Sequence, residues 1–222
     1  PGSVLRTTND FMSDKRAGSE LPHEKVHSVK QANKDDSAVS SAATQTKTTT
    51  QPTQSSFNNA EEFVSAVWEH AKTAAEKIGL NPAVMVAQAA LETGWGKHII
   101  NKSDGNSSNN LFNIKSDKSW EGDKASKVTL EFEQGTPVKK QASFRAYDSI
   151  KESVNDFVDF LTQNPRYEEA LQKTAQPNEF LDSLQKAGYA TDPNYPKKLI
   201  TLIERYELYK FDKKYIQNIL CK

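Results

Sequence analysis

A single ionisable side chain, Glu92, stands in the otherwise uncharged segment from Pro82 to Gly94. The positions three and four residues before Glu92 hold Ala and Gln, so helical spacing brings no cation to its face. Asn81 can cap this helix, Pro82 suits its first position, and Gly94 can end it in a left-handed turn. Apolar surroundings and the negative end of the helix dipole both disfavour a charged carboxyl. We therefore expect a raised pKa for Glu92.

A carboxylic acid that stays protonated near neutral pH can donate its proton to the leaving oxygen of a glycosidic bond. The same chemistry needs a second group for the positive centre or the attacking water. Glu131 is the leading candidate, 39 positions after Glu92 (131 minus 92). Three other acidic residues compete with it for this role: Glu121, Asp123 and Glu133.

Simpler interpretations stay open for both carboxyl groups. Glu92 can be a helix-end residue that reaches water or caps a backbone group. Many isolated acidic residues have no functional role, so isolation alone does not identify a site. Glu131 can be a solvated strand residue that pairs with Lys139 or Lys140 across a hairpin. Spacing alone does not choose between these interpretations and catalysis.

The convincing β pattern of the chain begins at Val128 and turns at Gln134 and Gly135. Apolar residues alternate with polar ones on the outgoing strand, and apolar residues recur on the return strand: Val128, Leu130 and Phe132, then Val138, Ala142 and Phe144. We expect these apolar residues on one face of a hairpin. Thr129 and Glu131 then belong to the opposite, polar face.

Helical periodicity dominates the remainder of the chain after Phe57. The predicted helices are Asn58 or Asn59 to about Gly79, Pro82 to Gly94, Ser149 to Asn164, shorter ones near Pro165 to Lys173 and Asn178 to Ala187, and a last one from about Pro196. A loop rich in Asn, Ser, Asp and Gly covers residues 101–110. The predicted class is α+β, a mainly helical domain with one β-hairpin.

Composition divides the chain near Phe57. Of the 20 aromatic residues (10 Phe, 3 Trp and 7 Tyr), only Phe11 precedes that point. Residues 37–56 are mostly Ser, Thr and Gln, which bury too little apolar surface to offset the entropy of ordering. We predict a flexible, disordered tail or linker at 1–56 and a globular domain at 57–222. Because the chain opens on Pro1 rather than Met, we expect it to be a piece of a longer protein.

Bulk properties argue against several classes of partner and cofactor. The 29 basic and 29 acidic residues balance, so nothing indicates nucleic acid as a partner. No apolar run approaches the ~20 residues of a membrane span. Cys221 stands alone, and the four histidines lack metal-ligand spacing: His23, His27, His70 and His98. We expect no metal and no other cofactor.

Four segments, in order between Asn58 and Tyr206, resemble motifs of the glucosaminidase family of peptidoglycan hydrolases. They are Gln88 to Gly96 around Glu92; Asn109 to Lys115, similar to Asn-Asn-Leu-Phe-Gly-Ile-Lys; Thr129 to Gly135 with Phe144 to Tyr147; and Ala187 to Pro193. The resemblance implies a lysozyme-like fold with a β-hairpin lobe. It also implies cleavage of the β-1,4 bond after N-acetylglucosamine in peptidoglycan.

Carried onto this sequence, the resemblance implies a set of site residues. Glu92 is the general acid, Glu131 the second carboxylate, and Tyr189 an orienting group in the cleft. The implied substrate-binding residues are Asn110, which helps to hold the acetamido group, and the aromatic residues Trp95, Phe112 and Tyr147. Aromatic residues at the spacings of Trp95 and Phe112 more often pack in the core, and for Trp95 the core and sugar-stacking roles are balanced.

One departure from the family pattern is Asn113, which stands where the family usually has Gly. Asn tolerates a left-handed backbone better than most residues, so we expect the loop to keep its course. A side chain at this position can narrow the cleft.

The resemblance is strongest to a flagellar member, in which a Ser/Thr-rich linker joins a rod-scaffolding domain to the hydrolase. It implies peptidoglycan glycan strands as the substrate, rod proteins as partners of a part preceding this chain, and the periplasm (flagellar basal body) as the location. A muramidase or lytic transglycosylase on the same fold remains an alternative. So does a non-catalytic module that binds wall glycan or rod proteins. A retaining, inverting or substrate-assisted mechanism stays open.

Overall fold

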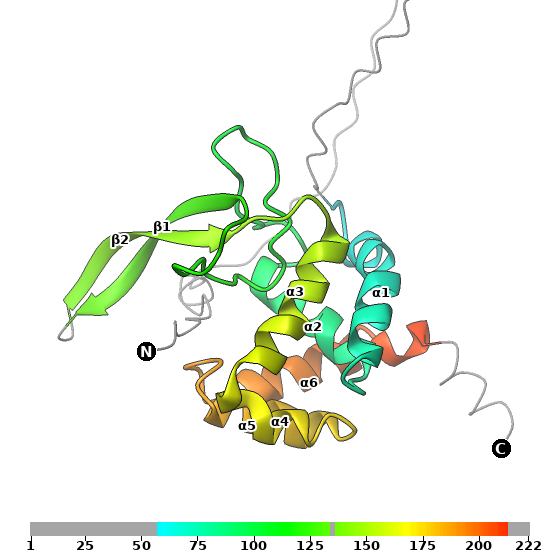
Figure 1. Ribbon diagram of the computed structural model, residues 1–222. Coiled ribbons are helices and arrows are strands. Elements are labelled where there is room, and N and C mark those ends of the chain that lie inside the picture. Colours follow the sequence, from blue (N-terminus) through cyan, green and yellow to red (C-terminus); the bar gives the residue numbers. More distant parts are fainter. Residues whose placement is uncertain (1–56, 134–135, 213–222) are drawn as a thin grey trace, which may run out of the picture.

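The computed structural model describes residues 57–133 and 136–212, with the backbone alone for residues 130–133, 136 and 137. The tail predicted at residues 1–56 lies outside the described part. In chain order the elements are α1 (Ala60–Glu76), α2 (Pro82–Thr93), β1 (Lys124–Glu133), β2 (Thr136–Arg145), α3 (Ile150–Gln163), η2 (Pro165–Tyr167), α4 (Glu168–Leu171), α5 (Pro177–Lys186), α6 (Tyr195–Arg205) and η3 (Leu208–Phe211). The prediction of a mainly helical domain with one hairpin is confirmed. Figure 1 shows the hairpin projecting from a body of helices.

Helix α2 forms the centre of the helical body. Its ends follow the sequence signals, because Asn81 caps the first turn by accepting a hydrogen bond from the Ala83 N–H, and Gly94 ends the helix at φ 58°. Every residue of α2 except Leu91 is buried. The helix lies against α1 and α6, and the surrounding core includes Phe63, Val67, Phe157, Leu161, Leu181 and Leu199. Glu92 is therefore placed at the end of the most deeply buried helix of the fold.

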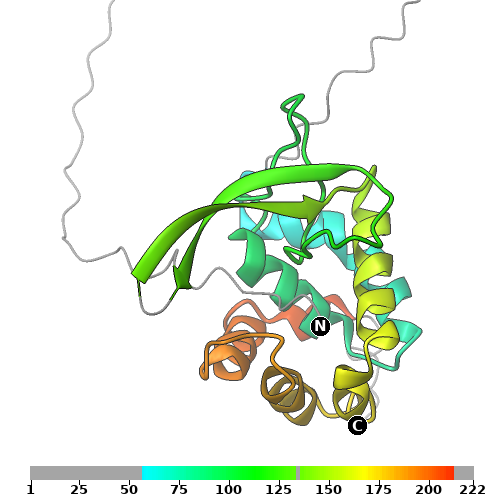
Figure 2. The same ribbon diagram turned by 60° about the vertical axis from the view of Figure 1, so that its left-hand side comes forward.

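The hairpin arches away from the helices, as Figure 2 shows with α4, α5 and α6 on the opposite side of the body. Its strands pair with Ala125 opposite Phe144 and Glu131 opposite Val138. Odd positions of β1 thus share a face with even positions of β2, since paired residues point to the same side. At the base of the hairpin, a small core forms from Ile100, Ala125, Ala142 and Phe144.

This register corrects the predicted apolar face. Val138, Ala142 and Phe144 share a row with positions 129 and 131, whereas Val128 belongs to the other face and is 62% exposed. The prediction treated the even positions of both strands as one row. The pairing of Glu133 with Thr136 makes even positions of one strand oppose odd positions of the other, so the two apolar rows lie on opposite faces.

The loop before the hairpin is tied to β2 by backbone hydrogen bonds. The N–H of Arg145 donates to the carbonyl of Ile114 at 2.9 Å, and the N–H of Ser116 donates to the carbonyl of Ser143 at 3.0 Å. Lys115 and Phe144 form an antiparallel bridge between them. These contacts fix residues 114–116, and with them the preceding residue Asn113, relative to the hairpin.

Among the described helices, none has both the length and the apolar character that crossing a membrane requires. Within residues 57–133 and 136–212, no group of three or more His, Cys, Asp or Glu side chains is arranged to hold a metal ion.

Candidate active site

Glu92 lies in the last turn of α2 with only 6% of its surface exposed. Burial raises the pKa of its carboxyl from 4.5 to about 8, and a hydrogen bond from Asn113 acts in the opposite direction. The predicted rise in pKa is confirmed, with removal from water as its main cause. At neutral pH most of this carboxyl is therefore protonated, which is the state that a proton donor needs.

Asn113 holds the carboxyl of Glu92 from the neighbouring loop. Its side-chain Nδ2 donates to the main-chain oxygen of Glu92 at 3.1 Å and to Oε2 at 3.2 Å. The other carboxyl oxygen, Oε1, is buried and has no hydrogen-bond partner in the structure. The backbone of Asn113 is left-handed at φ 50°, so the expected tolerance of Asn for this conformation is confirmed.

Two tyrosines lie near the same carboxyl: Tyr189 in the turn between α5 and α6, and Tyr195 at the start of α6. Tyr189 and Tyr195 are almost completely buried, with ring centroids 5.8 Å apart. Burial raises the pKa of both hydroxyls well above the ordinary value, and the nearby Glu92 raises both further. Gln88, one turn before Glu92, donates from Nε2 to the Tyr195 hydroxyl at 3.1 Å. Neither hydroxyl ionises in the ordinary pH range, so both act as neutral polar groups around the carboxyl.

Tyr189 was expected in the cleft near the sugar. It has no exposed surface and packs edge-on against Phe157 and Tyr167. This placement fits a residue that supports Glu92 from within the fold. Tyr195 and Gln88 were absent from the sequence-based site, because nothing in the sequence distinguished them from other residues that pack inside.

Asn110 and Phe112 are placed as structural residues of the loop. The Asn110 amide donates to the carbonyls of Ile114 and Arg145 at 2.9 and 2.8 Å, and its oxygen accepts from the Ile114 N–H at 3.0 Å. Phe112 is 1% exposed and its ring stacks on Phe157 with centroids 4.0 Å apart. The amide is bonded at both ends and the ring lies inside the core, so both side chains are buried here. Their predicted substrate-binding roles stay predictions.

Trp95 lies in a tight turn directly after α2. It has φ 60° between two glycines that are also left-handed, Gly94 and Gly96. Its ring packs edge-on against Phe63 at 6.0 Å and lies 4.2 Å from the ring of Tyr206. Trp95 packs against the core but is only partly buried, so both roles left open for it stay open.

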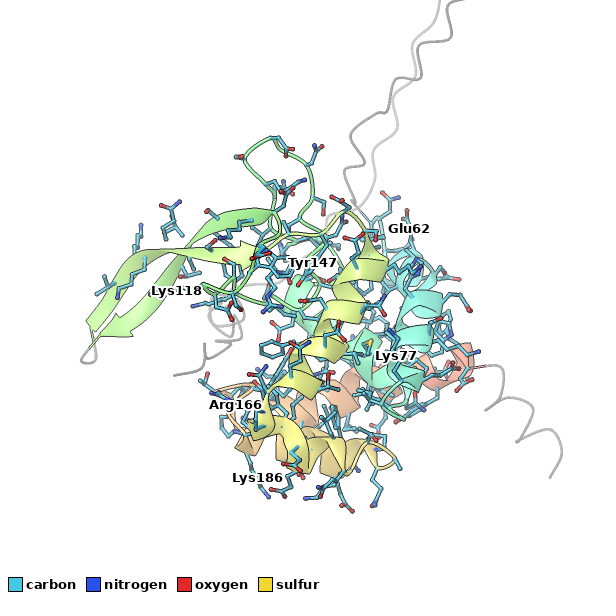
Figure 3. All side chains as sticks on the ribbon, in the orientation of Figure 1. Glu62, Lys77, Lys118, Tyr147, Arg166 and Lys186 are labelled. Atoms are coloured by element: carbon cyan, nitrogen blue, oxygen red, sulfur yellow. The ribbon has the colours of Figure 1, made fainter. Side chains whose placement is uncertain are left out.

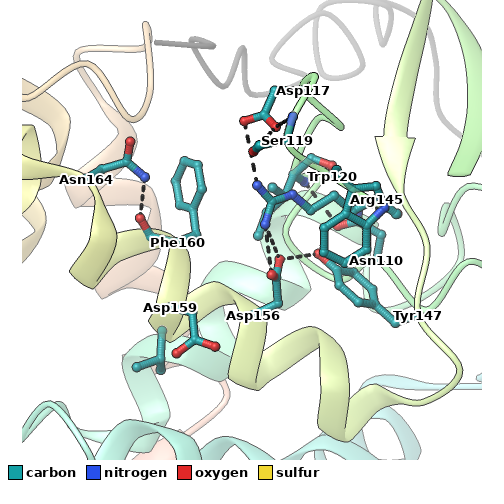
Figure 4. A network of polar contacts seen from close by, with 12 residues as sticks. Asn110, Asp117, Ser119, Trp120, Arg145, Tyr147, Asp156, Asp159, Phe160 and Asn164 are labelled. Atoms are coloured by element: carbon teal, nitrogen blue, oxygen red, sulfur yellow. Dashed lines mark hydrogen bonds and ion pairs between the residues drawn. The ribbon is translucent and has the colours of Figure 1, made fainter. Parts of the chain in front are cut away.

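Tyr147 lies where the hairpin joins α3 (Figure 3). It is 4% exposed, and its hydroxyl donates to Oδ2 of Asp156 at 2.6 Å. Arg145 binds the same carboxylate, and its guanidinium lies over the ring of Trp120 at 4.7 Å (Figure 4). An open pocket of about 430 Å³ borders this network and is lined by Trp120, Tyr147, Ser149, Lys151, Glu152, Asn155, Asp156 and Asp159. Glu92 does not line this pocket, so Tyr147 and Glu92 are not brought into one cavity here.

Glu131 lies near the far end of β1, two residues before its last residue, Glu133. Six positions separate it from Ala125 at the base of the hairpin, which corresponds to about 20 Å along a strand. The structure describes only the backbone at this position, so the predicted pairing of Glu131 with Glu92 stays a prediction. The rivals Glu121 and Asp123 are exposed in the segment before β1.

The sequence pattern of the Glucosaminidase family, described as mannosyl-glycoprotein endo-beta-N-acetylglucosaminidase, matches residues 68–208. This range holds α2, the hairpin, and both Tyr189 and Tyr195. The chain belongs to this family.

Two kinds of relative agree with that assignment. The chain is 47% identical over 158 residues to the peptidoglycan hydrolase FlgJ of Vibrio parahaemolyticus, covering 71% of this chain and 51% of that protein. It therefore spans about half the length of this curated relative. Among solved structures, the glycoside hydrolase domain of Salmonella typhimurium FlgJ is 36% identical, with a TM-score of 0.58, 74% of this chain covered and 99% of that chain. A peptidoglycan hydrolase from Sphingomonas sp. A1 is 38% identical, with a TM-score of 0.57, 72% of this chain covered and 92% of that chain.

Proposed function

We propose that this chain is a peptidoglycan hydrolase that cleaves the β-1,4 bond after N-acetylglucosamine, with Glu92 as the general acid. The observation that carries the proposal is the buried carboxyl of Glu92, whose pKa is raised to about 8. A protonated acid can transfer its proton to the leaving oxygen as the glycosidic bond breaks. The names of the relatives, peptidoglycan hydrolase and glycoside hydrolase domain, support the same substrate and bond class.

Glu131 is the proposed second carboxylate of this reaction. The register places position 131 in the same row of the hairpin as Ala125 and Phe144, which pack at its base. A carboxylate on the hairpin can approach a substrate from the side opposite α2, where it orients water or stabilises positive charge. Tyr189 and Tyr195 then support Glu92 from within the helical body.

We further propose a cellular role in opening the wall for assembly of the flagellar rod, in the periplasm. Support comes from the 47% identity to a relative named FlgJ. The part of that relative beyond the aligned half is where a contact with rod proteins is proposed. Restored motility in a strain without its own flagellar hydrolase, by wild type and not by Glu92→Gln, tests this role.

The biochemical test compares wild type, Glu92→Gln, Glu131→Gln and the matched control Glu69→Gln on purified peptidoglycan. Glu69 is an exposed residue of α1, so its variant controls for loss of a carboxyl elsewhere. We expect Glu92→Gln to lose at least about 100-fold in activity, as expected for removal of a general acid, while Glu69→Gln keeps it. Circular dichroism confirms that each variant is folded.

Mass spectrometry of the released ends decides which bond is cleaved. Reducing N-acetylglucosamine ends support the proposal. Reducing muramic ends indicate a muramidase, and anhydro-muramic ends indicate a lytic transglycosylase. If wild type binds insoluble wall without releasing sugar ends, the protein is a binding module rather than an enzyme. Wild-type activity in Glu92→Gln would remove Glu92 from the mechanism.

A further inference from the structure

We propose that Asn113 is a positioning residue, which orients the carboxyl of Glu92 and places its transferable proton on Oε1. The inference rests on the proposed role of Glu92 as general acid. Asn113 stands where the family motif usually has Gly. Its side chain gives Glu92 a hydrogen-bond donor that a glycine cannot supply.

The hydrogen bonds around the carboxyl carry the assignment. An amide nitrogen only donates, and Nδ2 has two hydrogens. These two hydrogens suffice for the contacts of Nδ2 with the main-chain oxygen of Glu92 at 3.1 Å and with Oε2 at 3.2 Å. Oε2 therefore accepts a hydrogen bond, so it is the carbonyl oxygen of the protonated carboxyl group. The hydroxyl hydrogen then belongs to Oε1.

The other oxygen has no competing acceptor in the protein. Oε1 is buried and makes no hydrogen bond within the structure. No protein group therefore holds its hydrogen, and a substrate oxygen can accept that hydrogen once substrate binding uncovers Oε1. Asn113 thus selects which oxygen of Glu92 carries the hydrogen, and it fixes the rotation of the carboxyl group at the same time.

The position of the Asn113 amide is set by the loop around it. The side chain of Asn110 bonds to both the N–H and the carbonyl of Ile114, the residue after Asn113. The N–H of Arg145 in β2 donates to the same carbonyl at 2.9 Å. The left-handed φ of 50° aims the Asn113 side chain back toward the end of α2. A loop that is bonded on both sides holds its amide in one place, which is what a positioning group requires.

The electrostatic surroundings make this hydrogen bond measurable. Burial raises the pKa of Glu92 to about 8, and the Asn113 hydrogen bond lowers it. Tyr189, in the turn after α5, and Tyr195, at the start of α6, lie near the carboxyl, and the ring of His98 lies against Gly94 at the end of α2. Removing the Asn113 amide leaves these groups in place, so the pKa of Glu92 should rise.

The experiment compares wild type with Asn113→Gly, which restores the family residue and tolerates the left-handed backbone. The carboxyl of Glu92 is followed by NMR with a ¹³C-labelled side chain, assigned by its loss in Glu92→Gln. Rates on peptidoglycan are measured from about pH 5 to about pH 10. We expect the Glu92 pKa to rise by about 1–2 units, since a hydrogen bond to a charged group is worth about 1.5–3 kcal/mol and one pKa unit corresponds to about 1.4 kcal/mol. The alkaline limb of the activity profile should rise with it.

Orientation has its own readout. Loss of the positioned rotamer should lower kcat about 3–10-fold near neutral pH with little change in KM, because bound substrate is unaffected and proton transfer is misaligned. The infrared C=O stretch of the protonated Glu92 carboxyl should move to higher frequency in Asn113→Gly. A C=O stretch that does not move overturns the assignment of the proton to Oε1.

Asn109→Gly is the matched control. Asn109 lies in the same loop at φ 53°, and its amide donates to the carbonyl of Tyr147 at 2.9 Å rather than to Glu92. It should leave the pKa of Glu92 unchanged. An unchanged NMR titration in Asn113→Gly, or an equal shift in Asn109→Gly, overturns the proposal. The NMR readout does not depend on catalysis, so it decides the role of Asn113 even if Glu92→Gln remains active.

Discussion

The hydroxyl of Tyr147 donates to Oδ2 of Asp156 at 2.6 Å, across the junction between the hairpin and α3. Arg145 contacts both oxygens of the same carboxylate from Nη1, at 2.8 and 3.0 Å. One carboxylate of α3 therefore receives two side chains from the end of the hairpin and its exit. Burial and the nearby Asp156 raise the pKa of the Tyr147 hydroxyl, which keeps it protonated as a donor. The three residues anchor the hairpin to the helical body.

Tyr147→Phe should lower the free energy of unfolding by about 1.5–3 kcal/mol, because it removes a largely buried hydrogen bond to a charged group. Urea unfolding measures this change. The control Glu169→Gln removes an exposed partner of Lys173 and should change stability by less than about 0.5 kcal/mol. The KM of the folded Tyr147→Phe variant should equal that of wild type. A raised KM at full stability would instead support the earlier prediction that Tyr147 binds substrate.

Glu92→Gln should become more stable than wild type as the pH rises. The folded-state pKa of about 8 lies above the ordinary value of 4.5, so the folded state retains a proton that the unfolded state releases. Wild type therefore loses stability from about pH 4.5 to about pH 8, by roughly 3 kcal/mol at neutral pH, whereas Gln has no such pH dependence. Thermal unfolding of both proteins at pH 5 and about pH 8 measures the gap. A gap that does not widen with pH contradicts the buried acid.

Local signals in the sequence determined much of the helical body. Asn81, Pro82 and Gly94 predicted both ends of α2, and the helix predicted from Ser149 is α3, with Ser149 as its cap. The first helix was predicted to about Gly79 but ends at Glu76, because residues 77–79 form a tight turn. Propensity and capping are local, so these elements could be assigned without tertiary information.

The start of β1 and the neighbours of Glu92 depend on contacts between residues that are distant in the sequence, so they could not be predicted from it. β1 begins at Lys124 rather than Val128, since its first residues lack a β pattern and are held by pairing with β2. The contacts of Glu92 are likewise distant in sequence, with Asn113 21 residues away. Tyr195, which bonds to Gln88, lies 107 residues from it. The sequence identified Glu92 as an isolated acid, and the fold supplied its neighbours.

Phe112→Ala should test the core placement of this ring. Phe112 is 1% exposed and stacks on Phe157, so truncation should lower the free energy of unfolding by about 3–5 kcal/mol. Phe112→Leu keeps most of the volume and should cost less. Calorimetry gives the stability. KM is measured from rates on peptidoglycan at low temperature, where the variant is folded. Retained stability in Phe112→Ala with a raised KM would show that the ring meets substrate after all.

Gly96→Ala should damage the turn that follows Glu92. Gly96 has φ 79°, and an added Cβ would collide with the ring of Phe57 and lie 2.9 Å from Cδ2 of Phe63. Gly105→Ala is a matched control, with φ 85° and no atom within 4 Å of its added Cβ. Both variants carry the strain of a left-handed Ala, about 1–2 kcal/mol. Gly96→Ala should lose about 1–3 kcal/mol more by overpacking, and kcat should fall as the end of α2 shifts. Equal losses in urea unfolding would show that the two phenylalanine rings move aside without cost.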